Sequence, residues 1–167
     1  KTSKELGAKT IIAIDIEQNR LELAREFGAD YIINPNEEKD IINKIKEITE
    51  NRGADYVIEV AGTPDVINDG IKFLRIGGTY ILLGAIYPGN NFTVDSSEII
   101  TKCINISGRH NYDAIHLKNA INIVQKSKEK FPYEKIVGPI FEFSKEGLED
   151  AFNSLNSKKS LRPVIIP

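Results

Sequence analysis

The stretch IIAIDIEQNRLELAREFGAD, residues 11–30, contains the two successive patterns that decide the fold. An apolar run over Thr10–Ile14 predicts a strand, and this strand ends at a carboxylate, Asp15. The charged segment that follows carries three apolar residues at helical spacing: Leu21, Ala24 and Phe27. It therefore predicts an amphipathic helix over Glu17–Phe27. A strand followed at once by such a helix is the repeating unit of parallel α/β sheets.

Strand-like and helix-like segments alternate along most of the chain. The strand-like segments are near-continuous apolar runs, which is typical of strands covered on both faces. They are Thr10–Ile14, Tyr31–Ile33, Asp55–Val60, Thr79–Leu83 and Ile104–Ser107. The helix-like segments are Glu17–Phe27, Glu37–Glu50, Asp65–Leu74 and Asp113–Lys128. This alternation predicts the α/β class with a doubly wound parallel sheet, the Rossmann fold.

Glycines punctuate the predicted helices, and the rhythm changes near the end of the chain. Gly28, Gly53 and Gly77–Gly78 are placed where left-handed helix caps are expected. The last part predicts a strand, a helix with Ser144 at its N-cap and a final strand, with these strands at Ile140–Phe143 and Val164–Ile166. We therefore expect a partial nucleotide-binding domain over residues 1–110. Residues 111–167 are expected to return toward a further domain and to pack partly against it.

Composition excludes several classes of function. The 167 residues carry 22 Lys and Arg against 24 Asp and Glu, and no basic block indicates a nucleic-acid or membrane-surface partner. The apolar runs, such as Tyr80–Leu83, are far too short to span a bilayer. The single cysteine, Cys103, excludes an internal disulfide, and the first residues do not look like a signal peptide. A cytoplasmic location is expected.

Asp15 has the chemistry of a nucleotide-binding residue, but the usual glycines are not in front of it. A carboxylate after the second strand of a dinucleotide-binding fold accepts hydrogen bonds from a ribose, about 20 residues beyond a G-x-G-x-x-G turn. Only fourteen residues precede Asp15, and the chain contains no such motif. This predicts that the chain begins inside the domain, without its first strand and Gly-rich turn, and that Lys1–Leu6 is the tail of a helix capped by Gly7. The alternative is that Asp15 caps the helix that follows.

Three segments together resemble one family. They are KELGAKTIIAIDIEQNRLELAREFGADYIINP, RGADYVIEVAGTP and LRIGGTYILLGA, in that order. They resemble the zinc-dependent alcohol dehydrogenases of the medium-chain dehydrogenase/reductase family. The segment ISGRHNYDAIHLKNAI is similar, more narrowly, to the branch associated with phosphonate catabolism. The resemblance implies the cofactor-binding portion of an NAD-dependent, zinc-dependent alcohol or polyol dehydrogenase.

The resemblance also implies residue roles toward NAD. It places Asp15 and Arg20 at the adenosine ribose, Ile16 beside the adenine, Val60, Ala61 and Gly62 along the dinucleotide, Gly84 and Ala85 beside the nicotinamide, Gly108 and Arg109 at its carboxamide, and Arg162 near the pyrophosphate. Arg20 and Arg162 have the alternative reading of ordinary surface charges. The resemblance supplies no catalytic residue and no zinc ligand within this sequence. The two histidines, His110 and His116, have no zinc-site spacing either.

Other functions and the assembly state stay open at this point. An S-adenosylmethionine-dependent methyltransferase also places an acidic residue after its second strand, and a nucleotide-binding module without chemistry would share the fold. The resemblance implies a homodimer or homotetramer through Ile104–Ser107 and residues near Phe92–Val94. An apolar, uncharged strand edge such as Ile104–Ser107 is also unfavourable to leave in water. We expect the 167-residue chain alone to have no dehydrogenase activity.

Overall fold

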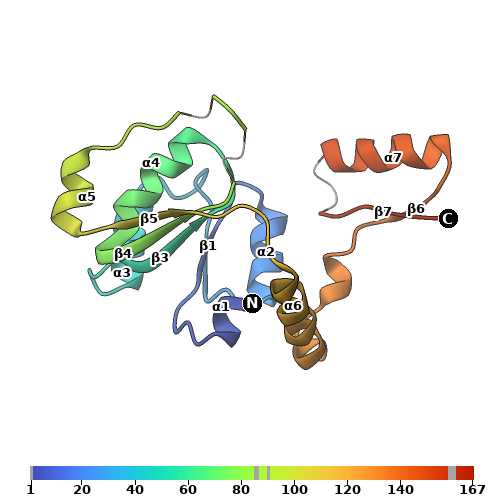
Figure 1. Cartoon of the computed structure of the whole chain (residues 1–167), viewed down its shortest axis with the longest axis horizontal. Helices are drawn as coiled ribbons and strands as arrows, with labels where there is room; N and C mark the ends of the chain where they lie inside the picture. The colour runs from blue at the N-terminus through green and yellow to red at the C-terminus, as the bar shows by residue number, and fades with distance from the viewer. Residues whose placement is uncertain (1, 85–86, 90, 158–160) are drawn as a thin grey trace. The chain divides into compact units, whose positions relative to one another are not determined.

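The computed structural model describes residues 2–84, 87–89, 91–157 and 161–167. It divides the chain into two compact units, residues 1–34 with 115–167, and residues 35–114 (Figure 1). The strand pairs within the described residues are parallel, and helices connect successive strands. This confirms the predicted α/β class. The two units interleave along the chain, whereas the predicted domains are consecutive, and the domain assignment stays a prediction.

The unit of residues 35–114 is built on a three-stranded sheet in the order β3-β4-β5. Its strands are β3 (Ala54–Glu59), β4 (Leu74–Leu82) and β5 (Asn105–Gly108). Its helices are α3 (Ile41–Ile48), α4 (Pro64–Phe73) and α5 (Ser96–Lys102). Figure 1 shows α4 in green and α5 in yellow beside these strands.

Within this unit, one face of the sheet is covered and side chains on the other face are exposed. Ile67 and Ile71 of α4 are completely buried against Leu74 and Tyr80 of β4. Partly buried side chains of the strands, α5 and the segment before it complete the cluster: Val57, Leu82, Val94, Ile99 and Ile106. Because side chains alternate along a strand, the neighbours of Val57 point the other way. Tyr56 and Ile58 are accordingly 67% and 50% exposed.

Tyr80 joins α4 to the sheet. Its ring is fully buried, and its hydroxyl donates to the carbonyl oxygen of Ile67 at 3.1 Å. Burial, with the carboxylates of Glu59 and Asp69 nearby, raises the pKa of Tyr80 far above its ordinary value. The hydroxyl therefore stays protonated and continues to donate to the helix.

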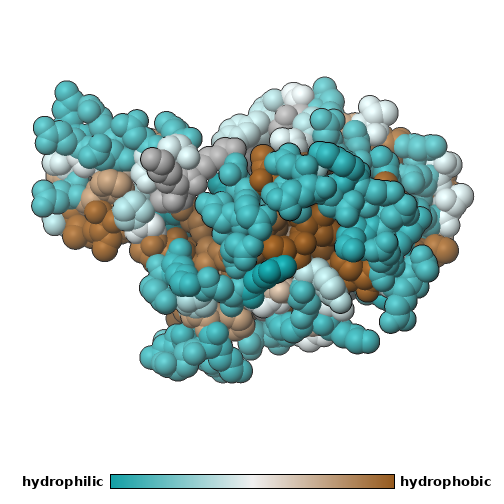
Figure 2. Space-filling model, turned by 180° about the vertical axis from the view of Figure 1, so that it is seen from behind, coloured by the Kyte–Doolittle hydropathy of each residue, from teal (hydrophilic) through white to brown (hydrophobic). Residues whose placement is uncertain are grey.

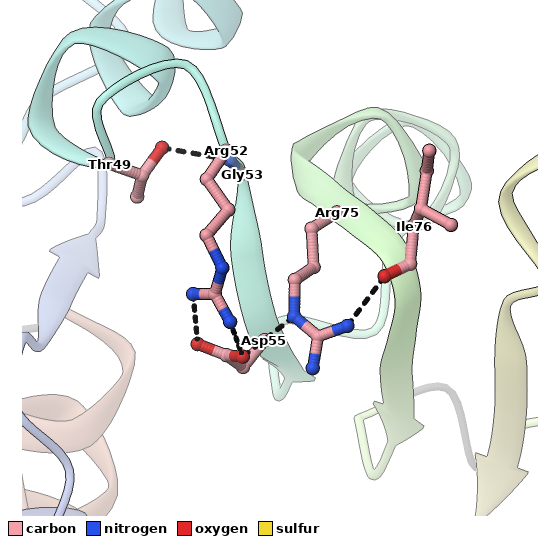
Figure 3. Close-up of polar contacts among 6 residues, drawn as sticks. All are labelled: Thr49, Arg52, Gly53, Asp55, Arg75 and Ile76. Atoms are coloured by element: carbon pink, nitrogen blue, oxygen red, sulfur yellow. Dashed lines mark hydrogen bonds and ion pairs between the residues drawn. The ribbon is translucent and has the colours of Figure 1, made fainter.

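Asp55 is the centre of a charged cluster at the beginning of β3 (Figure 3). Arg52 donates to both carboxylate oxygens of Asp55, at 2.9 and 2.5 Å. The Nε of Arg75, from β4, donates to Oδ1 of Asp55 at 2.7 Å, and Nη1 of Arg75 donates to the carbonyl oxygen of Ile76. The hydrogen bonds from Arg52 and then Arg75 lower the pKa of Asp55 to about 2. The cluster therefore links the starts of β3 and β4.

Replacement of Asp55 by asparagine should lower the free energy of unfolding near neutral pH and have less effect in acid. Between about pH 4 and 2 the unfolded carboxyl gains a proton that the folded one does not, so stability present above this window is lost as the pH falls through it. Denaturant unfolding of both proteins at about pH 6 and about pH 3 measures this. Asp150→Asn, which removes an exposed charge in residues 145–156, outside β3, is the control. An equal difference at both pH values would contradict the expectation.

The other unit contains the two-stranded sheets β1-β2 and β6-β7. Its first part comprises α1 (Thr2–Glu5), β1 (Ile12–Ile14), α2 (Gln18–Glu26) and β2 (Tyr31–Ile33). Its second part comprises most of α6 (Ala114–Ser127), the 3₁₀ helix η1 (Tyr133–Lys135), β6 (Ile140–Glu142), α7 (Lys145–Asn156) and β7 (Val164–Ile166). Leu21 packs α2 on its strands and is 1% exposed. The ring of Phe27 stacks on Phe131, with the centroids 5.8 Å apart.

The strand orders agree with the expected fold. A doubly wound sheet of two mononucleotide-binding halves has the order 3-2-1-4-5-6. Within the separate sheets, the neighbours β2-β1 and the order β3-β4-β5 are each consistent with a part of that order.

Several predicted helix ends lie within one or two residues of the observed ones, but two glycine predictions are wrong and one helix was missed. Gly53 does not cap α3, because that helix ends at Ile48 and its C-cap is Thr49. Ser144 caps α7 by accepting from the N–H of Gly147, as expected. Gly77–Gly78, however, lies inside β4 and not at a helix end. Ala54 pairs with Leu74 but Tyr56 pairs with Thr79, so β4 accommodates extra residues there, and Gly77 takes a φ of +70°. The helix α5, which begins after Asp95, was not predicted at all.

Large apolar side chains remain exposed in both units, and Figure 2 shows hydrophobic surface among hydrophilic side chains on the face opposite to that of Figure 1. On α6, Leu117, Ile121 and Val124 share one face by helical spacing and are 42–50% exposed. None of the described helices has the length and hydropathy of a membrane span.

Candidate functional site

Asp15 is the first residue after β1 and begins the turn that leads to α2. Its N–H donates to the carbonyl oxygen of Ile33 at 3.3 Å, which extends the pairing of β1 with β2. Its Oδ1 accepts from the N–H of Glu17 at 2.9 Å, and its Oδ2 lies 3.8 Å from Nη1 of Arg20. The hydrogen bond from Glu17 orients the carboxylate. The Asp15 side chain is 32% exposed, so a ligand can reach it.

The helix-capping alternative for Asp15 does not describe this geometry. The N-cap of α2 is Glu17, and α2 has no side-chain cap. Asp15 accepts from Glu17 itself, whereas a capping side chain accepts from an N–H of the first helical turn. A carboxylate has roughly four lone-pair positions, so one backbone hydrogen bond leaves Asp15 able to accept from a pair of hydroxyls.

Arg20 is more constrained than a solvated surface charge. Its side chain is 38% exposed, yet its Nε is buried and has no hydrogen-bond partner among the described residues. Arg20 lines a cavity of about 430 Å³ within its unit. The other lining residues are Asn19, Leu23, Lys135, Val137, Gly138, Pro139 and Leu161. Arg162 is the residue after Leu161 in the sequence and is exposed. Its carbonyl oxygen accepts from the N–H of Gly138.

Three strand ends come together in the unit of residues 35–114. The pairing register places Glu59 of β3 beside Leu82 of β4, and Leu82 beside Gly108 of β5. The segments that follow these positions are the predicted site residues: Val60, Ala61 and Gly62 after β3, Gly84 after β4, and Arg109 after β5. The structure therefore brings the predicted residues of this unit to one edge of one sheet. Ala85 lies outside the described residues.

Backbone hydrogen bonds tie these strand ends to one another. The carbonyl oxygen of Glu59 accepts from the N–H of Leu83 at 3.0 Å and from the N–H of Gly84 at 3.2 Å. The N–H of Arg109 donates to the carbonyl oxygen of Leu82 at 3.0 Å. Val60 and Arg109 are exposed beyond these bonds, so the edge is ordered by its backbone and accessible to solvent.

The two predicted glycines at this edge differ in what surrounds them. A Cβ on Gly84 would lie 2.5 Å from the nitrogen of Gly62 and 2.6 Å from the carbonyl carbon of Val60. Gly84 is thus required by the close approach of the turn after β3, a reason within the chain that the sequence analysis did not foresee. A Cβ on Gly108 would meet no described atom within 4 Å. The space in front of Gly108 is open.

Glu59 is a residue of this edge that the sequence analysis missed. It is 3% exposed, and its Oε1 accepts from the N–H of Gly62 at 2.5 Å. The signal was in the sequence. Glu59 is two residues beyond Val57, so the period of a strand places it on the covered face, where a carboxylate is rare unless it is paired.

Ile16 and the histidines complete the description of the predicted residues. Ile16 follows Asp15 and is 54% exposed, so it presents apolar surface beside the carboxylate. His110 and His116 are both exposed. Among the described residues, no three His, Cys, Asp or Glu side chains are grouped so that they could hold a metal ion.

Comparisons with known proteins agree with this architecture. The family model described as zinc-binding dehydrogenase matches residues 1–126. D-xylulose reductase A of Aspergillus oryzae is 32% identical over 166 residues, which are 98% of this chain and 45% of that protein. L-threonine 3-dehydrogenase of Pyrococcus horikoshii is 36% identical over 112 residues, 65% of this chain and 31% of that protein. The chain therefore spans about half the length, or less, of these relatives.

A solved structure shares the fold closely. The alcohol dehydrogenase of Thermotoga maritima superposes with a TM-score of 0.91 at 26% identity, over 99% of this chain and 45% of that one. The comparisons do not support the methyltransferase or the non-catalytic module. The chain belongs to the zinc-binding dehydrogenase family, the medium-chain dehydrogenases/reductases, and corresponds to their cofactor-binding part.

Proposed function

We propose that this chain is the cofactor-binding part of an NAD-dependent, zinc-dependent dehydrogenase that transfers hydride between a small alcohol or polyol and NAD. The alignment of Glu59, Leu82 and Gly108 at one sheet edge is the observation that carries the proposal. Open α/β sheets bind their ligands outside the carboxyl ends of the strands, and the segments there are exposed and joined by backbone hydrogen bonds.

The proposed contacts with NAD follow from the chemistry of each residue. The free acceptor positions of Asp15 suit the adenosine ribose hydroxyls, Arg20 lies next to that carboxylate, and the exposed side chain of Ile16 suits the adenine face. The backbone of Val60, Ala61 and Gly62 would lie along the dinucleotide. Gly84, Ala85, Gly108 and Arg109 would meet the nicotinamide end, and Arg162 would lie near the pyrophosphate.

Zinc would act as a Lewis acid on the substrate oxygen, while the cofactor accepts or supplies the hydride. We propose that the zinc ligands belong to a part of the protein outside these 167 residues. The chain alone would then have no dehydrogenase activity. Two relatives are named for xylulose and threonine, and only the general class, a small alcohol, is proposed for this protein.

Assembly and location are also proposals. In the sheet order β3-β4-β5, the outer edge of β5 pairs with no strand among the described residues. This edge is uncharged and carries Ile106, so pairing with the same edge of a second copy would cover it. We propose a homodimer, or a homotetramer of such dimers, with Phe92–Val94 nearby, in the cytoplasm.

The proposed function predicts that the full-length protein prefers NAD over NADP by at least about tenfold in kcat/KM, which corresponds to about 1.4 kcal/mol. Asp15 can accept from both adenosine ribose hydroxyls of NAD. In NADP a phosphate replaces one hydroxyl, so an acceptor interaction is lost and two negative groups face each other. Asp15→Ser should weaken NAD and reduce the discrimination against NADP, with the KM for the alcohol little changed. Steady-state kinetics with both cofactors measures this.

Asp150→Ser is a matched control, because Asp150 is an exposed aspartate on α7 with no proposed role. It should leave both cofactor efficiencies unchanged. Equal efficiency with NAD and NADP in the unaltered protein, or an unchanged ratio in Asp15→Ser, would remove the assignment of Asp15.

A further inference from the structure

Glu59 makes contact with two turns of the candidate cofactor edge at once. Its side chain accepts from the N–H of Gly62 in the turn after β3. Its backbone carbonyl accepts from Leu83 and Gly84 after β4. Glu59, at the end of β3, therefore holds both the turn after β3 and the segment after β4 through hydrogen bonds.

The Glu59 carboxylate is unusually placed for a group that only stabilises the fold. It is 3% exposed, and its Oε2 is buried with no hydrogen-bond partner among the described residues. A buried carboxylate costs free energy unless it is paired, so an amide or an apolar side chain would be the less costly choice for packing alone.

The turn after β3, which Glu59 holds, is tightly constrained by its neighbours. Gly62 has a φ of +77°, and its nitrogen lies 2.5 Å from the position that a Cβ on Gly84 would take. The turn after β3 is therefore packed directly against the backbone after β4. The carboxylate fixes Gly62 from one side, and the Gly84 backbone adjoins it at close range.

We propose that Glu59 is a positioning residue for the dinucleotide. It holds the N–H of Gly62, and with it the backbone of Val60–Gly62, in the arrangement that the cofactor meets at the sheet edge. This inference rests on the proposed function. According to this proposal, the buried carboxylate of Glu59 controls the affinity for NAD without contacting the ligand itself.

The test uses the full-length protein, with NADH titration by fluorescence and steady-state kinetics. Glu59→Ala should raise the Kd for NADH and the KM for NAD by at least about tenfold and change kcat by less than about threefold. Glu59→Gln keeps an acceptor toward Gly62 and should stay within about threefold of the unaltered protein in all three constants. Glu47→Ala, an exposed glutamate of α3, is the matched control and should change none of them.

Thermal unfolding of each variant separates positioning from folding. A role in folding alone would lower the active fraction, and therefore kcat, with KM for NAD unchanged, and this result would overturn the proposal. Glu59→Gln as impaired as Glu59→Ala would overturn the assignment to the Gly62 hydrogen bond. If Glu59→Ala does not fold, Glu59→Asp withdraws the carboxylate by one methylene and should raise the same constants. Unaltered protein that binds no NADH refutes the proposed function as well, whereas binding that the variants leave unchanged refutes only the positioning role.

Discussion

Replacement of Gly70 by alanine is expected to destabilise the protein by about 1–3 kcal/mol, although alanine is the better helix former by about 1 kcal/mol. Gly70 lies in α4, and a Cβ there would be 2.2 Å from the hydroxyl oxygen of Tyr80 and 2.6 Å from its Cζ. Because Tyr80 is fully buried, its ring cannot turn into solvent, and α4 must move off the sheet. Denaturant unfolding at equilibrium measures the effect.

The double variant Gly70→Ala with Tyr80→Phe is the control for this explanation. Removal of the hydroxyl takes away the nearest atom but leaves the ring carbon at 2.6 Å, and it also removes the hydrogen bond to Ile67. Gly70→Ala should therefore cost less stability in the Tyr80→Phe background than in the unaltered protein. Stabilisation by Gly70→Ala, in the direction of helix propensity, would mean that α4 does not pack on Tyr80 in this way.

The second large effect is expected at Gly84. Alanine there would place its Cβ 2.5 Å from the nitrogen of Gly62 and 2.9 Å from the nitrogen of Ala61. Both contacts are with backbone, which cannot rotate aside, so the turn after β3 must shift. We expect the affinity of the full-length protein for NADH to fall at least about tenfold, or about 1.4 kcal/mol. Fluorescence titration with NADH gives the dissociation constant.

Gly108→Ala is the comparison for stability alone, because Gly108 is itself a proposed contact with the cofactor. The chain has room for this Cβ, since no described atom lies within 4 Å, so the thermal unfolding midpoint should stay unchanged. Weaker NADH binding with unchanged stability would then report a ligand in front of Gly108. Full NADH affinity in Gly84→Ala would contradict the close packing of the two turns as the determinant of this edge.

Sequence patterns predicted the elements that local chemistry determines. The apolar run before Asp15, the stripe containing Leu21 and the cap at Ser144 all lie where local chemistry decides the backbone. The helix α5 escaped prediction because seven residues are too few for a helical period to separate from a loop. Gly77–Gly78 was misplaced because a glycine pair marks a helix end and a strand irregularity equally well.

The candidate site shows a different limit. Its strand-end residues could be named from the sequence through a family resemblance, and the register brings those of one unit together. The role of Gly84 depends on a backbone that arrives from more than twenty residues earlier in the chain, which no local pattern records. Glu59 could have been found by strand periodicity, but its partner Gly62 required the geometry of the turn.

The open face of the three-stranded sheet has a practical consequence for experiments on isolated pieces. A protein cut to residues 35–114 would expose Tyr56 and Ile58 of β3 on one face of the sheet, and β5 would be an unpaired edge strand on the far side of β4. Such surfaces stick to one another, so the piece would be prone to precipitate at the concentrations that spectroscopy needs. Loss of soluble protein would then result from aggregation of the folded piece, and it would not mean that the sheet is unable to form.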